Sequence, residues 1–247
     1  MSPLFRRKRQ DAQEPVPPSS TQDVDEEEVL DEEEEDVLLP SKSDRPDGPW
    51  DVEERPQEDS AVVDLGALRL RGRDGMELRL EVDEAAGLVT AASIKLAGSA
   101  VQLQVFAAPR SRGIWDEIRT EIAAGITRQG GVVDEVPGAF GKELIARIPV
   151  RTPDGRSGHQ PARFAGVDGP RWFLRAVFHG PAVHDTQAAQ QLESVVRDVV
   201  VVRGSEAMAP RELLSLTLPG TASPAAAGAA DDDLKPFERG PEITEIR

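Results

Sequence analysis

Residues 163–179 read RFAGVDGPRWFLRAVFH, two largely apolar runs on either side of a turn-forming segment. In the second run, apolar side chains recur at every second position: Trp172, Leu174, Ala176 and Phe178. A period of two places such side chains on one face of a β-strand, and Asp-Gly-Pro at 168–170 favours a tight turn. The pattern therefore predicts a β-hairpin of an antiparallel sheet, with strands at 163–167 and 172–179.

Upstream of this hairpin, the same period of two predicts further strands. Residues 68–71 and 76–82 alternate apolar with charged side chains around Asp74-Gly75, so they predict a first hairpin with one face in solvent. Two more strands are expected at 88–96 and 100–107.

After Pro109 the apolar period lengthens to three or four residues, which is typical of an amphipathic helix. Ser111 is a suitable N-cap, and Gly130-Gly131 is a suitable end. The apolar positions of this helix are Ile114, Trp115, Ile118, Ile122 and Ile126. A helix of this kind is expected to lie across the buried face of the sheet.

The remaining segments complete the predicted fold. Strands are expected at 132–136 and 144–150, a second helix at 185–198 and a last strand at 199–202. The sequence thus predicts an α+β fold with about eight or nine antiparallel strands in the order ββββ-α-ββββ-α-β and both helices packed on one face. A single domain would span residues 61–219, and its last part would pack through four leucines: Leu213, Leu214, Leu216 and Leu218.

Charge is distributed unevenly along the chain. The protein has 29 Lys+Arg and 45 Asp+Glu, a formal net charge of −16, and most of the acidic excess lies in residues 1–60. An acidic, proline-rich segment cannot bury enough apolar surface to fold alone, so we expect a disordered arm there. It serves either as an acidic interaction tail or only as a solvating segment. Residues 220–247 are expected to be a low-complexity disordered tail.

Two parts of the arm differ from the acidic run. The basic N-terminus, Arg6–Arg9, could contact anionic lipid or nucleic acid. The segment Gly48-Pro49-Trp50-Asp51 carries a large aromatic side chain that a fully solvated tail would not favour. Pro49, Trp50 and Asp51 are therefore candidate docking residues, either for a partner protein or for the chain's own domain.

Residues that carry catalytic chemistry are scarce, because the chain has no Cys, no Tyr and three His. Disulfides and thiolate metal sites are excluded. His179, His184 and Asp185 match no metal-ligand motif, and Gly138–Glu143 lacks a glycine and the hydroxyl residue of a phosphate loop. We expect no catalytic, cofactor or metal site and no enzyme activity, with a small-molecule enzyme as the third hypothesis.

Arginines on the predicted first hairpin form a candidate basic cluster: Arg69, Arg71, Arg73 and Arg79. A nucleic-acid platform normally adds stacking aromatic side chains and a clear excess of positive charge, and the domain has neither. A nucleic-acid or nucleotide-binding module is therefore the second hypothesis. The first is a non-enzymatic protein-interaction or regulatory module that receives an unidentified protein partner on a sheet face or groove.

Several stretches resemble an uncharacterised actinobacterial family, the domain of unknown function 3710. They are residues 48–51, 76–82, 106–111, 113–117, 166–175 and 199–204. The resemblance implies a cytoplasmic protein, often encoded near a dUTP-hydrolysing enzyme and a small OB-fold protein, and it implies no catalytic residue. The residues themselves also predict a cytoplasmic protein, since no apolar run has the length of an export signal or a membrane span.

Overall fold

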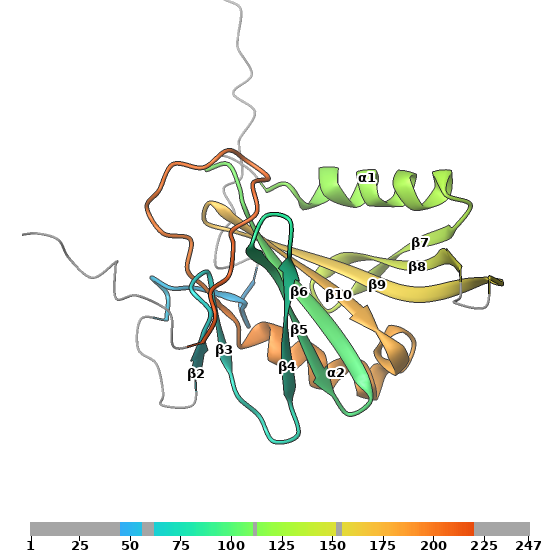
Figure 1. Ribbon diagram of the computed structural model, residues 1–247, viewed down its shortest axis with the longest axis horizontal. Helices are drawn as coiled ribbons and strands as arrows, with labels where there is room; N and C mark the ends of the chain where they lie inside the picture. Colours follow the sequence, from blue (N-terminus) through green and yellow to red (C-terminus); the bar gives the residue numbers. More distant parts are fainter. Residues whose placement is uncertain (1–44, 56–61, 111–112, 152–154, 220–247) are drawn as a thin grey trace, which may run out of the picture. The chain divides into compact units, whose positions relative to one another are not determined.

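The computed structural model describes residues 45–55, 62–110, 113–151 and 155–219 (Figure 1). The acidic run of the predicted arm, its basic N-terminus, the proposed cap Ser111 and the predicted tail at 220–247 all lie outside the described residues. No helix in the described ranges is long and apolar enough to cross a membrane.

The described elements combine two α-helices with short and long strands. In chain order they are β1 Trp50–Asp51, β2 Val62–Asp64, β3 Leu68–Arg71, β4 Glu77–Asp83, β5 Leu88–Leu96, β6 Ser99–Ala107, α1 Trp115–Arg128, β7 Val132–Gly138, β8 Gly141–Arg151, β9 Ser157–Gly169, β10 Trp172–His179, the 3₁₀ helix η2 Gly180–Val183, α2 Thr186–Arg197 and β11 Val200–Val201. The α+β class is confirmed, and so is the predicted order of elements from α1 onwards.

A seven-stranded sheet forms the larger part of the fold. Its strand order is β4-β5-β6-β10-β9-β8-β7, and every pair of neighbours is antiparallel. The predicted hairpin is confirmed as β9 and β10, in which Trp172 pairs with Gly169. Gly169 is required there, because a Cβ at this position would lie 2.2 Å from the Trp172 indole.

A smaller sheet has the strand order β1-β11-β3-β2, with β1 parallel to β11. This sheet corrects the predicted first hairpin. β3 pairs with β2 and β11, whereas β4 pairs with β5, so residues 68–71 and 77–83 belong to different sheets. Asp74-Gly75 does form a turn, but the turn connects the two sheets. Alternation predicted the buried face of each strand and could not predict its partner.

The two side-chain sets of β10 point to opposite faces of the large sheet. Trp172, Leu174 and Phe178 are buried in the main core, which also contains side chains of α2. Phe173 lies on the other face, where its ring stacks on Trp115 of α1 with 5.8 Å between centroids. The helices therefore cover opposite faces (Figure 1), and the prediction that both lie on one face is wrong. A strand covered on both sides must be apolar at both alternating sets, as β10 largely is.

Helix α1 begins without a side-chain cap from its own N-cap residue, Ile114. Instead, the carboxylate of Asp168 at the end of β9 accepts hydrogen bonds from the backbone N–H groups of Ile114 (2.8 Å) and Trp115 (3.2 Å). A carboxylate at a helix N-terminus satisfies free donors and complements the helix dipole. The β9–β10 hairpin thus fixes the start of α1.

Residues on both sides of the predicted domain pack on its sheets. Residues 45–55, which the sequence analysis assigned to the arm, contribute β1 to the small sheet, so the folded part begins before residue 61. At the other end, Leu214 and Leu216 are buried, and their N–H groups bond to Val105 and Val89 of the large sheet, each at 2.9 Å. Leu218 is exposed, unlike the other two.

Candidate functional site

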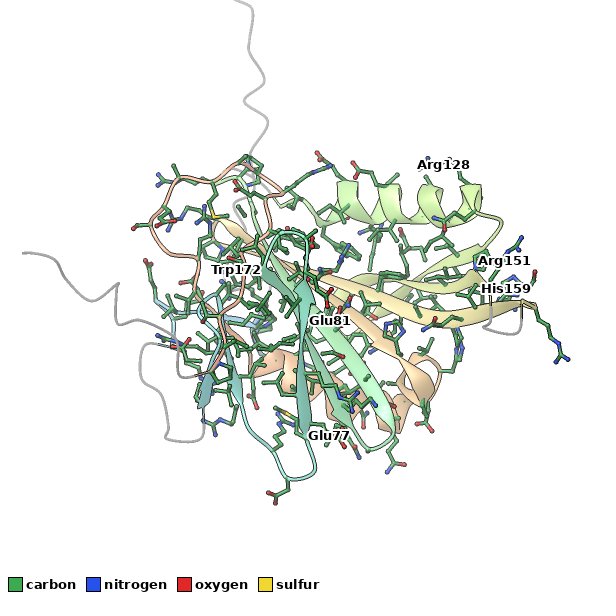
Figure 2. All side chains as sticks on the ribbon, viewed as in Figure 1. Glu77, Glu81, Arg128, Arg151, His159 and Trp172 are labelled. Atoms are coloured by element: carbon green, nitrogen blue, oxygen red, sulfur yellow. The ribbon has the colours of Figure 1, made fainter. Side chains whose placement is uncertain are left out.

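One half of a face of the large sheet carries polar side chains. Helix α1 packs against β7, β8 and β9, whereas β4, β5, β6 and β10 present hydrogen-bonding groups on the same face. We call these residues the polar face: Arg79, Glu81, Ser93, Gln102, Gln104 and Arg175. Glu77 and Glu81 lie on β4, which is an edge strand of the large sheet (Figure 2). The face is exposed at β4 and becomes partly buried towards β10.

The polar face is ordered by the register of its strands. A row of paired residues crosses four of them: Val177, Gln102, Ser93 and Arg79. Beside this row, Arg175 of β10 pairs with Gln104 of β6. Directly opposed residues in antiparallel strands have Cβ atoms about 4.5–5.5 Å apart, so these side chains are within reach of one another.

Arg175 is the unusual member of the polar face, because its charge is not neutralised by the described residues. Its guanidinium donates to Gln104 Oε1 and lies 5.4 Å from the centroid of the Phe106 ring. Its Nε is buried and has no hydrogen-bond partner in the described part of the chain. Burial lowers the pKa of Arg175, and no carboxylate opposes that effect.

A cation in this position is costly to the free protein. Removing an ionised group from water without a paired charge costs several kcal/mol in real proteins. Arginine stays protonated despite a lowered pKa, so the charge persists at neutral pH. The site can therefore accept an anionic group from another molecule, to which the guanidinium offers charge-assisted hydrogen bonds.

The neighbours of Arg175 hold this arrangement in place. Gln104 donates its amide N–H to the Thr90 carbonyl at 3.4 Å, which leaves its oxygen to accept from Arg175. Gln102 donates to Glu81 at 2.6 Å. Burial lowers the pKa of His179 at the end of β10, while the charge of Glu81 acts in the opposite direction. The polar face thus combines two oriented amides with one uncompensated cation.

The candidate docking residues Pro49, Trp50 and Asp51 lie against the chain's own domain. Asp51 is buried, and its Oδ2 accepts a hydrogen bond of 2.7 Å from Nε1 of the fully buried Trp172. Pro49 is also buried, and Trp50 is partly buried with the Arg55 guanidinium 5.3 Å from its ring centroid. These contacts are intramolecular.

Arg45 completes this attachment of the N-terminal segment. It forms two hydrogen bonds of 2.7 Å with Glu54, and its guanidinium lies 5.2 Å from the Trp172 ring centroid. We call Arg45, Asp51, Glu54 and Trp172 the clasp. Because three of its four residues are buried, the clasp stabilises the fold and offers little surface to a partner.

The candidate basic cluster is divided between the two sheets. Arg69 and Arg71 lie on β3 of the small sheet, and Arg79 lies on β4 of the large one. Arg69 forms an ion pair with Asp64 (3.3 Å), Arg73 with Asp198 (2.6 Å) and Arg79 with Glu77 (3.7 Å). These three arginines are thus paired with carboxylates, and Arg73 also anchors the end of α2 through the Ser194 carbonyl.

The glycine-rich segment at 138–143 and Asp185 have structural roles. Gly138 and Gly141 pair across the tight turn between β7 and β8, and Asp185 caps α2 through the N–H groups of Gln187 and Ala188. In the part of the chain that the structure describes, no group of three or more His, Asp or Glu side chains could hold a metal ion.

Sequence reasoning did not identify Arg175, Gln102 or Gln104 as site residues. A signal was present, since Arg175 interrupts the otherwise apolar run WFLRAVF and the two glutamines alternate with buried residues of β6. An arginine within a central strand is rarely buried unless it is paired with another group. Its strand neighbours were needed to tell which.

The fold and the polar face define an α+β protein that presents half of a sheet face, with one unneutralised arginine, beside its first helix. The chain belongs to the family described as "Protein of unknown function (DUF3710)", which matches residues 48–225 and confirms the resemblance noted in the sequence. No curated protein matches the chain.

Proposed function

We propose that this protein is a non-enzymatic interaction module that receives an acidic segment of a partner protein on its polar face. The observation that carries the proposal is the uncompensated guanidinium of Arg175. A carboxylate from a partner would supply the counter-charge that the described residues lack, and it would also give Nε a hydrogen-bond acceptor.

A protein partner fits this surface better than a small anion. The polar face is a half-exposed sheet surface that extends over four strands, and its arginine lies next to the partly buried ring of Phe106. Arginine and aromatic side chains are enriched among the residues that dominate protein–protein binding. Gln102, Gln104 and Ser93 add hydrogen-bonding groups around this centre.

Charge also favours a protein over nucleic acid. Arg69, Arg73 and Arg79 are paired with carboxylates, and the whole chain has a formal net charge of −16. Binding of nucleic acid depends mainly on phosphate neutralisation by several cations. Among the described arginines of the polar face, Arg175 alone lacks a carboxylate partner, and one such arginine meets the needs of a single carboxylate contact.

Site-directed photo-cross-linking tests the location of the proposed interface. A benzoylphenylalanine in place of exposed Lys95, which pairs with Glu77 beside the polar face, should cross-link a protein partner in cell extract. The same group in place of Arg128, exposed at the end of α1 (Figure 2), is the control and should not. A cross-linked nucleic acid, or equal cross-linking from both positions, overturns the proposal.

The affinity of the purified partner then tests the role of Arg175. Arg175→Gln should weaken binding by about tenfold to a hundredfold, because a hydrogen bond to a charged group contributes about 1.5–3 kcal/mol. Arg128→Gln removes the same charge from α1 and should leave the affinity unchanged. Equal affinities of wild type and Arg175→Gln would show that the partner binds elsewhere.

A further inference from the structure

A second site lies on the opposite face of the large sheet, independent of the polar face. An open cavity of about 260 Å³ is lined by the β7–β8 hairpin, β9, η2 and α2. Water in bulk occupies about 30 Å³ per molecule, so the cavity has room for a compound with several non-hydrogen atoms. Its walls include apolar residues, among them Val136, Pro137 and Ile145.

Two buried glutamates reach this cavity. Glu143 of β8 has no exposed surface; its Oε1 accepts a hydrogen bond from the Phe140 N–H at 3.1 Å, and its Oε2 has no hydrogen-bond partner among the described residues. Glu193 of α2 is 7% exposed and accepts from Arg163 Nη2 at 2.8 Å. Both residues line the cavity.

One guanidinium does not balance both carboxylates. Arg163 makes its short contact with Glu193, while its Nε is 3.6 Å from Glu143 Oε2 and forms no hydrogen bond there. The guanidinium is further fixed by the Phe178 ring, whose centroid is 4.1 Å away. Burial raises the pKa of Glu143, and Glu193 adds to that rise, while Arg163 opposes it. Together, Glu143, Glu193 and Arg163 therefore carry one negative charge in excess when Glu143 is ionised.

The hairpin is shaped around the carboxylate of Glu143. A Cβ at Gly138 would lie 2.1 Å from its carboxyl carbon, so glycine leaves room for the group in its present position. A carboxylate that served no purpose there could be replaced by an apolar side chain at little cost to stability.

We propose that this cavity binds a small alkylammonium compound. Its N–H groups would donate to Glu143 Oε2 and Glu193, and its hydrocarbon part would lie against Val136, Pro137 and Ile145. An ammonium supplies donors in several directions, which Arg163 in its present position does not offer to Glu143. A metal ion fits less well, because the described residues contain no group of three or more metal-ligating side chains and Arg163 is adjacent.

An NMR titration of the full chain with n-butylammonium chloride tests the proposal on the unmodified protein. The amide signals of Ala182–Thr186 and Ala189 should shift with saturation, at a dissociation constant on the order of millimolar for so small a ligand. Tetramethylammonium chloride, which has no N–H donor, and 1-butanol, which has no charge, should not produce these shifts at equal concentration. Shifts located elsewhere, or equal shifts with all three compounds, overturn the proposal.

Two conservative variants add a second test. Glu143→Gln and Glu193→Gln should each weaken n-butylammonium binding by about tenfold or more, since each loses a charge-assisted hydrogen bond. Glu84→Gln removes a carboxylate from an exposed turn and should bind as wild type does. If both cavity variants keep the wild-type affinity, the glutamates do not bind the ammonium group and the proposal is wrong.

Discussion

Replacement of Arg175 by methionine should leave the unliganded protein equally stable or make it more stable. The side chain keeps a similar length and can still pack on the Phe106 ring, but it no longer places a charge in a partly buried site. If Arg175 instead stabilised the fold, its replacement by methionine would lower the free energy of unfolding. The substitution thus separates a binding role for Arg175 from a structural one.

The expected magnitude follows from the contacts of the guanidinium. Arg175→Met loses the hydrogen bond to Gln104, worth about 1.5–3 kcal/mol, and the contact with Phe106, worth about 0.5–1 kcal/mol. It also removes a desolvation cost of several kcal/mol that no carboxylate offsets. The free energy of unfolding should therefore change by between about 0 and +2 kcal/mol.

Urea denaturation of the full chain, followed by tryptophan fluorescence, measures this change. Arg163→Met is the matched comparison, because Arg163 is buried and paired with Glu193. Breaking a buried pair costs about 3–5 kcal/mol, so this variant should unfold at a much lower urea concentration. A loss of more than about 1 kcal/mol in Arg175→Met would refute the reasoning and assign Arg175 to the stability of the sheet.

Three further substitutions test other parts of the structure. Asp51→Ala should lower the free energy of unfolding by about 1.5–3 kcal/mol, because the buried indole N–H of Trp172 loses its acceptor; exposed Asp47→Ala should not, and equal urea midpoints for both variants would show that the clasp contributes nothing. Gly169→Ala should cost about 1–3 kcal/mol in thermal unfolding, because its Cβ would lie 2.2 Å from the Trp172 indole, and an unchanged melting temperature would count against the close approach. For Glu143, burial raises the pKa in the folded state, so its stabilising contribution is complete below the usual glutamate pKa and is lost as pH rises through the raised one. The stability of wild type should therefore fall relative to that of Glu143→Gln as pH rises above the usual glutamate pKa, and parallel stability–pH curves would contradict this.

The parts of the fold that the sequence predicted correctly depend on local signals. The hairpin at 163–179 combines a period of two with turn residues, and α1 combines an apolar stripe with a terminal Gly130. Both signals act over a few residues, so no knowledge of distant partners is needed. The same is true of α2, whose cap Asp185 lies at the predicted start.

The errors concern which elements meet. β3 and β4 both alternate, and Asp74-Gly75 lies between them, yet β3 pairs with β11 from the far end of the chain. Alternation defines a buried face, whereas the partner depends on the whole core. The side on which each helix packs was predicted wrongly for a related reason. Phe173 and Val177 make the second face of β10 apolar as well, so this face also needed an element packed against it.

The candidate site was harder to predict than the fold. The sequence analysis did not single out Arg175, whereas it grouped Arg69, Arg71, Arg73 and Arg79 because they are close in sequence. Their carboxylate partners include Asp198, which is far from Arg73 along the chain. Whether a cation is neutralised depends on such distant neighbours, so sequence spacing could not rank the arginines.

The central claim is that a partner's carboxylate binds Arg175. The NMR signal of the Arg175 Nε–H group, assigned by its absence in Arg175→Met, tests this most directly, because that N–H has no acceptor in the described structure. When the purified partner identified by cross-linking is added, we predict that this signal shifts in proportion to the bound fraction. An unchanged Arg175 signal at full occupancy of the partner would contradict the claim.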